Sequence, residues 1–156
     1  MNNELYVGYK NLLTKRLVEF RNPVGIAFAN LLQTVPSTNY EILHIEVFLE
    51  EPAFRFRGFS MDAQNSQTAT PSEIEEFNVQ LETLWPIMTQ DELDQFTVWE
   101  DDPKWGRQVA LKQPIDELNI PKLVLPWLKE IVAEVRGNFA KRITANVHDI
   151  TLDEEL

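Results

Sequence analysis

Hydrophobic positions recur at helical spacing over the first 35 residues, in two stretches that Asn22 and Pro23 separate. Within residues 3–21 the apolar side chains fall three or four positions apart, as on one face of a helix. Asn22 suits a helix N-cap and Pro23 suits the first helical position, and a second apolar stripe then runs to Val35. The pattern therefore predicts a helical hairpin at the N-terminus.

From about residue 41 to residue 61 the period changes to the alternation of a β-strand. A turn over residues 50–53 would fold this segment into a hairpin in which apolar residues share one face. The predicted register sets Val47 opposite Phe56, Phe48 opposite Arg55, and Glu46 opposite Arg57. Gly58 lies inside the second strand, where a glycine indicates a bulge or a close approach of another part of the backbone.

A second hairpin is expected over about residues 96–112, because turn-forming residues such as Pro103 and Gly106 separate two alternating stretches. Centring its turn on residues 102–105 defines the register. The predicted pairs are Phe96 with Leu111, Val98 with Val109, Trp99 with Gln108, and Glu100 with Arg107.

Two capping boxes predict helices between the hairpins. Ser72 and Glu75 begin a central helix that Pro86 stops, and Thr89 and Glu92 begin a short helical turn. A C-terminal helix follows from about Pro121, with Asp116 or Asn119 as its cap, Pro126 at an early or kinked position and Gly137 near its end. Residues 140–150 fit either a continuation of that helix or a short strand.

These elements predict an α+β fold. We expect the two β-hairpins, at about 41–61 and 96–112, to join in one antiparallel sheet with helices packed on at least one face. Residues 1–150 are expected to form a single domain, which 156 residues readily allow. Residues 151–156, TLDEEL, have the composition of a disordered acidic tail.

Acidic residues are concentrated in the middle of the chain. The net charge is −11, and residues 72–102 hold ten Asp or Glu residues but no Lys or Arg. Half of these acids lie in or beside the first turns of the predicted helices, where the helix dipole favours negative charge. A surface of this kind repels phosphate backbones and attracts basic proteins, so direct nucleic-acid binding is disfavoured.

The predicted tip of the second hairpin, TVWEDDPKWG, combines acids with two tryptophans. Exposed aromatic residues beside a charged field are typical of protein interfaces. The alternative interpretation is that the acids only coat solvated surfaces while the tryptophans are covered by helices or by the hairpin itself. The candidate partner-binding residues are Glu73, Glu76, Asp91, Asp94, Trp99, Glu100, Asp101, Asp102 and Trp105.

Known catalytic patterns are missing from the sequence. The chain has no cysteine, and its two histidines, His44 and His148, accompany no nucleophile elbow, phosphate loop or zinc motif. His44 shares a predicted strand face with Glu46, a spacing that is more often structural than metal-binding. We therefore expect no catalytic residue, no metal and no cofactor. No signal peptide or apolar run long enough to span a membrane is recognisable, and we expect a cytoplasmic protein that binds no membrane.

Three functional hypotheses follow. The favoured one is a non-enzymatic acidic module that neutralises a basic partner protein, as an immunity protein or antitoxin neutralises a toxin. The second is an acidic, dimeric secretion-type chaperone or adaptor. The expected order of helices and strands is similar to that of secretion chaperones, and the resemblance extends no further than this order. The third is a small enzyme that uses carboxylates or His44.

Overall fold

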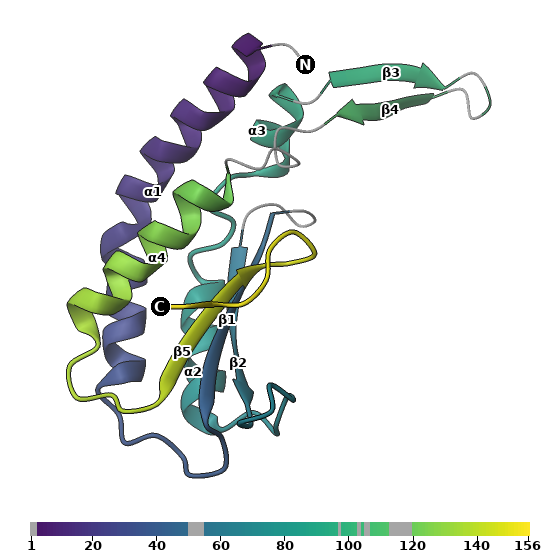
Figure 1. Ribbon diagram of the computed structural model, residues 1–156. Helices are drawn as coiled ribbons and strands as arrows, with labels where there is room; N and C mark the ends of the chain where they lie inside the picture. The colour runs from purple at the N-terminus through teal and green to yellow at the C-terminus, as the bar shows by residue number, and fades with distance from the viewer. Residues whose placement is uncertain (1–2, 50–54, 97, 103, 105–106, 113–119) are drawn as a thin grey trace.

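The chain forms an α+β fold, drawn in Figure 1 from a computed structural model that describes residues 3–49, 55–96, 98–102, 104, 107–112 and 120–156. Its helices are α1 (Asn3–Leu32), α2 (Ser72–Glu82), α3 (Gln90–Gln95) and α4 (Pro121–Val135). Its strands are β1 (Ile42–Phe48), β2 (Arg55–Met61), β3 (Val98–Asp102), β4 (Arg107–Lys112), β5 (Arg142–Val147) and β6 (Glu154–Glu155). Within β3 and β4 only the backbone is described, apart from the side chain of Asp101.

The main sheet is mixed and has the strand order β2-β1-β5-β6. β1 pairs antiparallel with β2 and parallel with β5. The expectation of one antiparallel sheet built from both hairpins was therefore wrong, because β3 and β4 form a separate two-stranded sheet. The segment 140–150, which fitted helix or strand, supplies β5, and Ile143, Ala145 and Val147 are buried at alternate positions along it. Gly137, at φ +55°, follows the end of α4 and turns the chain toward β5.

The predicted register of the first hairpin is confirmed. Val47 lies opposite Phe56, Phe48 opposite Arg55, and Glu46 opposite Arg57. A close approach does occur at Gly58, but side chains of α2 make it and not another part of the backbone, since a Cβ at this position would meet Phe77 Cδ1 at 3.1 Å. Only a glycine lets α2 pack this tightly on β2.

The predicted register of the second hairpin was wrong by two residues from Trp99 to Asp102 and by three at Val98. The observed pairs are Val98 with Lys112, Trp99 with Ala110, Glu100 with Val109, Asp101 with Gln108, and Asp102 with Arg107. Phe96, expected to begin the strand, instead ends α3, and its ring lies 6.0 Å from that of Tyr9 in an edge-on contact. The difference arises at the turn end of the hairpin, because β3 runs to Asp102 and pairs there with Arg107, whereas the predicted turn began at residue 102. A further shift between Val98 and Trp99 changes the partner of Val98 by one more residue.

The N-terminal helical hairpin was also a wrong prediction, because α1 is one helix of 30 residues with Pro23 inside it. Leu17 and Val24 are buried seven positions apart, which is about two helical turns, so the apolar stripe stays in phase across the proline. Packing along the whole stripe outweighs the cost of an interior proline, about 3 kcal/mol in an isolated helix. Trp127 of α4 supports this packing by donating from Nε1 to the Leu17 carbonyl at 2.9 Å.

Of the two predicted capping boxes, the one at Thr89 and Glu92 is confirmed, with both reciprocal hydrogen bonds present. The one at Ser72 and Glu75 was wrong, because Pro71 is the N-cap of α2 and no side chain caps it. The N-cap of α4 is Ile120, and the proposed caps Asp116 and Asn119 lie outside the described residues. Pro121 takes the first position of α4, as expected, but Pro126 lies inside the helix at its sixth position, where an early or kinked position was expected.

The acidic C-terminal segment is ordered where disorder was expected. Glu154 and Glu155 form β6 on the edge of β5, and Arg142 Nη2 donates to Glu155 Oε2 at 2.9 Å. The amide of Leu156 donates to the Ile143 carbonyl at 2.8 Å, and the Leu156 side chain packs on the core. Backbone pairing and one partly buried apolar residue thus order the segment despite its charge.

Helices α1, α2 and α4 pack on one face of the main sheet and enclose the core (Figure 1). At its centre Phe28 of α1 contacts Phe77 of α2 and Phe56 of β2, with ring centroids 4.9 and 6.1 Å apart. Among the helices that the structure describes, none combines the length and apolar character that crossing a membrane requires.

Candidate functional site

Helix α3 fixes the base of the β3–β4 hairpin. Glu92 closes the capping box with Thr89 and also accepts a hydrogen bond from Arg16 Nη2 of α1 at 2.7 Å. Burial alone would raise the pKa of Glu92, but the bonds from Arg16 and Thr89 outweigh it and hold the pKa below its ordinary value. Leu93 is buried in the core. The start of β3 is therefore anchored to α1 by both charge and packing.

Beyond this anchor, β3 and β4 project from the body of the molecule as a two-stranded ribbon (Figure 1). Among the described elements, neither strand has extensive contact with any other element besides its partner strand. Asp101 is exposed on this ribbon. The hairpin that the sequence predicted thus exists, but it stands away from the main sheet.

The predicted partner-binding residues fall into two separate groups. Asp91 and Asp94 lie on α3, where Asp91 is exposed and Asp94 is half-buried and accepts from Gln90 Nε2 at 3.0 Å. Trp99, Glu100, Asp101 and Asp102 belong to β3, next to α3 in the chain. The side chains of Trp99, Glu100 and Asp102, and the whole of Trp105, lie outside the described parts. Whether the tryptophans are exposed therefore stays a prediction.

The second group, Glu73 and Glu76, lies on α2, which packs against β2 well away from the ribbon (Figure 1). Glu73 is engaged within the fold, since the Ser37 amide and Oγ donate to its carboxylate at 2.6 and 2.9 Å. Burial acts to raise the pKa of Glu73, but these two bonds and nearby Lys141 bring it below the ordinary value. Glu76 is exposed. The fold therefore does not bring these two acids together with the ribbon.

The two histidines are held by different partners. His44 is buried, its Nδ1 lies 2.8 Å from Thr144 Oγ1, and its Nε2 lies 4.0 Å from Asp153 Oδ1. His148 is exposed, with Nδ1 2.7 Å from Glu46 Oε1 and Nε2 3.2 Å from Asp149 Oδ2. The Glu46 carboxylate thus contacts His148 and not His44. Within the described parts of the chain, no three His, Asp or Glu residues are arranged to hold a metal ion.

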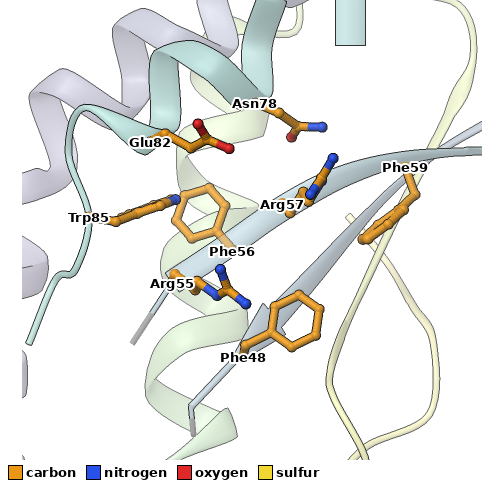
Figure 2. Close-up of a pocket in the computed structure, with 8 residues that line it drawn as sticks. All are labelled: Phe48, Arg55, Phe56, Arg57, Phe59, Asn78, Glu82 and Trp85. Carbon is orange, nitrogen blue, oxygen red and sulfur yellow. The ribbon is translucent and has the colours of Figure 1, made fainter. Parts of the chain in front are cut away.

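Sequence reasoning missed a pocket of about 130 Å³ at the edge of β2, beside the second half of α2 (Figure 2). Four aromatic side chains, two arginines, an amide and one carboxylate line it. They are Phe48, Arg55, Phe56, Arg57, Phe59, Asn78, Glu82 and Trp85. Residues of both faces of the sheet meet here because β2 is an edge strand. His44 does not line the pocket.

Asn78 closes the inner side of the pocket at the free edge of β2. Its Oδ1 accepts from the Gly58 amide at 2.8 Å, and its Nδ2 donates to the Gly58 carbonyl at 3.0 Å. The buried side chain of Asn78 thus replaces a neighbouring strand at this point. Phe56 and Trp85 stand beside it, with ring centroids 4.6 Å apart in an edge-on arrangement.

The two arginines of the pocket lie over aromatic rings. The Arg55 guanidinium is 5.4 Å from the Phe48 ring centroid, and that of Arg57 is 5.8 Å from the Phe59 centroid. In the part of the chain that the structure describes, no carboxylate forms an ion pair with either of them. Glu46, the cross-strand neighbour of Arg57, turns to His148 instead.

The sequence contained a signal for this site in the alternation FRFRGF over residues 54–59. We interpreted its arginines as outer-face partners of Phe48 and Glu46. The contact of Arg55 with Phe48 is present, and Glu46 lies opposite Arg57 as predicted but pairs with His148. Trp85 and Asn78 come from the chain after β2, so only the folded structure could join them to this motif.

Comparison with protein-family models, with curated proteins and with solved structures finds no match for the chain. The functional argument therefore depends on the geometry above.

Proposed function

We propose that the protein is a non-enzymatic binding module for a basic protein partner, which it neutralises in the manner of an immunity protein or antitoxin. The partner is bound by the β3–β4 ribbon together with the acids of α3. We place this activity in the cytoplasm.

The projecting ribbon is the observation that carries the proposal. A ribbon that is anchored at its base and makes no extensive contact with other described elements is free to enter a concave surface of a partner. Its first strand has the sequence VWEDD, and Asp101 on it is exposed. Charged groups at such a position steer encounter, while aromatic anchors supply affinity.

The charge distribution supports the same proposal. The ribbon follows α3 directly, so Asp91 and the acids of β3 act on the same approaching surface. The acids of α2 contribute less, because Glu73 is engaged by Ser37. We accordingly limit the proposed contact surface to α3 and the ribbon.

The two other hypotheses have weaker support. A chaperone that holds an unfolded apolar segment needs a continuous apolar sheet face. On the outer face of this sheet His44, Glu46 and Arg57 alternate with the apolar residues Ile42, Phe48 and Phe59. An enzyme based on His44 needs that residue beside a cavity, but His44 is buried and hydrogen-bonded to Thr144. The observed element order also differs from the expected one, since α1 is a single helix.

Charge reversal on the ribbon tests the proposal. The tagged wild-type protein, the double variant Asp101→Lys/Asp102→Lys and the control Glu75→Lys/Glu76→Lys would each be used to capture partners from the source cell. The control carries the same change in net charge on exposed positions of α2. We expect a basic protein that the wild type and the control retain and the ribbon variant loses.

Association kinetics of the captured protein complete the test. Reversal on the ribbon should slow association by about tenfold or more at low salt, and the control should change it by less than about twofold. Equal retention by all three proteins, or association that neither salt nor the ribbon variant alters, would contradict the proposal.

A further inference from the structure

The pocket at the edge of β2 has the chemistry of a binding site for an anion. Six arginines have described side chains, and four of them donate to carboxylates or to backbone carbonyls. The other two, Arg55 and Arg57, both line this pocket, and their guanidinium groups form no hydrogen bond within the described residues. In a chain of net charge −11, two arginines without acidic partners side by side on one strand are unexpected.

The stacking of these arginines presents their donors to a ligand. A guanidinium that lies over an aromatic ring keeps its N–H groups in its own plane, where a carboxylate can accept two of them. Arg55 Nε is buried and has no acceptor among the described atoms. A buried donor without an acceptor is unfavourable unless a bound group supplies one. A ligand carboxylate would satisfy it.

The aromatic side chains define the body of the ligand. Figure 2 shows Trp85 and Phe56 on one side of the pocket and Phe48 and Phe59 on the other, with the two arginines between them in this view. A planar ring can pack against such walls face to edge. The pocket volume of about 130 Å³ suits one ring, since a cavity of about 150 Å³ in another protein holds a single benzene.

The charge of the pocket selects the anion. Arg55 and Arg57 contribute two positive charges, and Glu82 at the end of α2 contributes one negative charge. The lining thus has a formal charge of +1, which matches a single carboxylate better than a dianionic phosphate. Asn78 is neutral and does not change this charge, and one of its two amide N–H groups is used by the Gly58 carbonyl.

We propose that this pocket binds a small aromatic monocarboxylate, with the carboxylate held by Arg55 and Arg57 and the ring packed against Phe56 and Trp85. This inference does not depend on the proposed binding of a basic protein, because the pocket and the β3–β4 ribbon belong to different sheets.

Titration with benzoate, followed by amide chemical shifts in NMR spectra of the full chain, tests the inference. Acetate has the carboxylate without the ring, benzyl alcohol has the ring without the charge, and inorganic phosphate is the alternative anion. We expect saturable shifts with benzoate, centred on β2 and the end of α2. Each of the other three probes should bind at least about tenfold more weakly.

Two variants assign the binding to the pocket. Arg57→Gln removes an exposed charge with little risk to folding, and we expect it to weaken benzoate binding by about tenfold. Lys129→Gln, on the exposed face of α4, removes the same charge elsewhere and should change affinity by less than about twofold. Unchanged amide spectra in the absence of ligand would show that both variants are folded.

Three outcomes would overturn the inference. One is the absence of saturable shifts with benzoate up to about 20 mM, because binding weaker than this would not indicate a specific site. Another is benzoate binding that Arg57→Gln leaves unchanged. The third is binding of acetate or phosphate as tightly as benzoate, which would show an anion site that does not recognise a ring.

Discussion

At the scale of single residues, a few polar side chains decide how the elements meet. Asn78 is buried on α2 and makes two hydrogen bonds to the backbone of Gly58 on β2. Glu73 joins the start of the same helix to Ser37, in the segment after α1. Neither contact can be predicted from the sequence, because each partner lies more than 15 residues away along the chain and only the fold brings the two residues together.

Replacing Asn78 tests the first of these contacts. Asn78→Ala would leave the N–H and C=O of Gly58 without these partners in a buried place, and we expect a loss of about 2–3 kcal/mol in the free energy of unfolding. Urea denaturation measures this. The adjacent exposed residue provides the control, since Val79→Ala should change stability by less than about 0.5 kcal/mol. Equal effects of the two substitutions would show that the amide contributes nothing specific.

Glu73 gives a prediction about pH. Its pKa in the folded protein lies below the ordinary value of 4.5, so the folded state binds this proton less tightly than the unfolded state does. The contribution of Glu73 to stability is thus present above about pH 4.5 and is lost as the pH falls through the folded pKa. Glu92 and Glu155 have lowered pKa values as well and act in the same direction.

We expect Glu73→Ala to lower the free energy of unfolding at pH 7 by about 1–2 kcal/mol, because the two hydrogen bonds from Ser37 are lost. This difference from the wild type should shrink as the pH falls below about 4.5 and through the folded pKa of Glu73, because the wild type then loses the carboxylate as well. Denaturation curves at several pH values provide the measurement, with exposed Glu76→Ala as control. A difference that does not vary with pH would exclude the carboxylate as its source.

At the scale of elements, periodicity predicted the elements more reliably than their ends or their partners. The first hairpin has the predicted register because a single alignment of its strands places apolar residues together on one face and polar residues together on the other. The register of the second hairpin was wrong because β3 runs to Asp102 and pairs there with Arg107, so the turn lies one residue later than predicted. Phe96 packs on Tyr9 and ends α3 instead of starting a strand. α1 continues through Pro23 because its buried stripe stays in phase, which outweighs a local helix-breaking preference.

The C-terminal strand offers a test at this scale. Leu156 packs on the core and its amide pairs with Ile143, whereas Leu152 is 91% exposed. We expect Leu156→Ala to lower the free energy of unfolding by about 1–2 kcal/mol, and Leu152→Ala to change it by less than about 0.5 kcal/mol. Thermal and urea unfolding provide the comparison. If the two leucines were equivalent, β6 would not contribute to the stability of the sheet.

At the scale of the whole molecule, two features stand apart from the helix-covered sheet. The β3–β4 ribbon projects from it, and the aromatic pocket opens at its β2 edge. The ribbon was predicted as a hairpin with candidate binding residues, and its sequence position next to α3 brings Asp91 and Asp101 into one region. The pocket was not predicted, since its residues come from the end of β1, from β2, from the second half of α2 and from the segment after α2.

Removal of the ribbon tests its independence from the core. Because β3 and β4 have no extensive contact with other described elements, replacing residues 98–112 with a short Gly/Ser linker should preserve cooperative unfolding. We expect a change of less than about 1 kcal/mol in the free energy of unfolding, together with loss of partner binding. A large loss of stability would show that the ribbon packs on the body of the protein.

The sequence by itself determined the α+β class, the position of most helices and strands, the first hairpin with its register, the Thr89 capping box and the excess of acids around α3 and the ribbon. These features arise from local periodicity, capping and charge, which short stretches of chain carry. Tertiary structure decided the insertion of β5 beside β1, the separation of β3–β4 from the main sheet, the continuity of α1 and the pairing of Glu46 with His148. Each of these features depends on which distant parts of the chain pack against one another. Residues far apart in the sequence then compete for the same partner, and the spacing of residues along the chain does not predict which of them binds it.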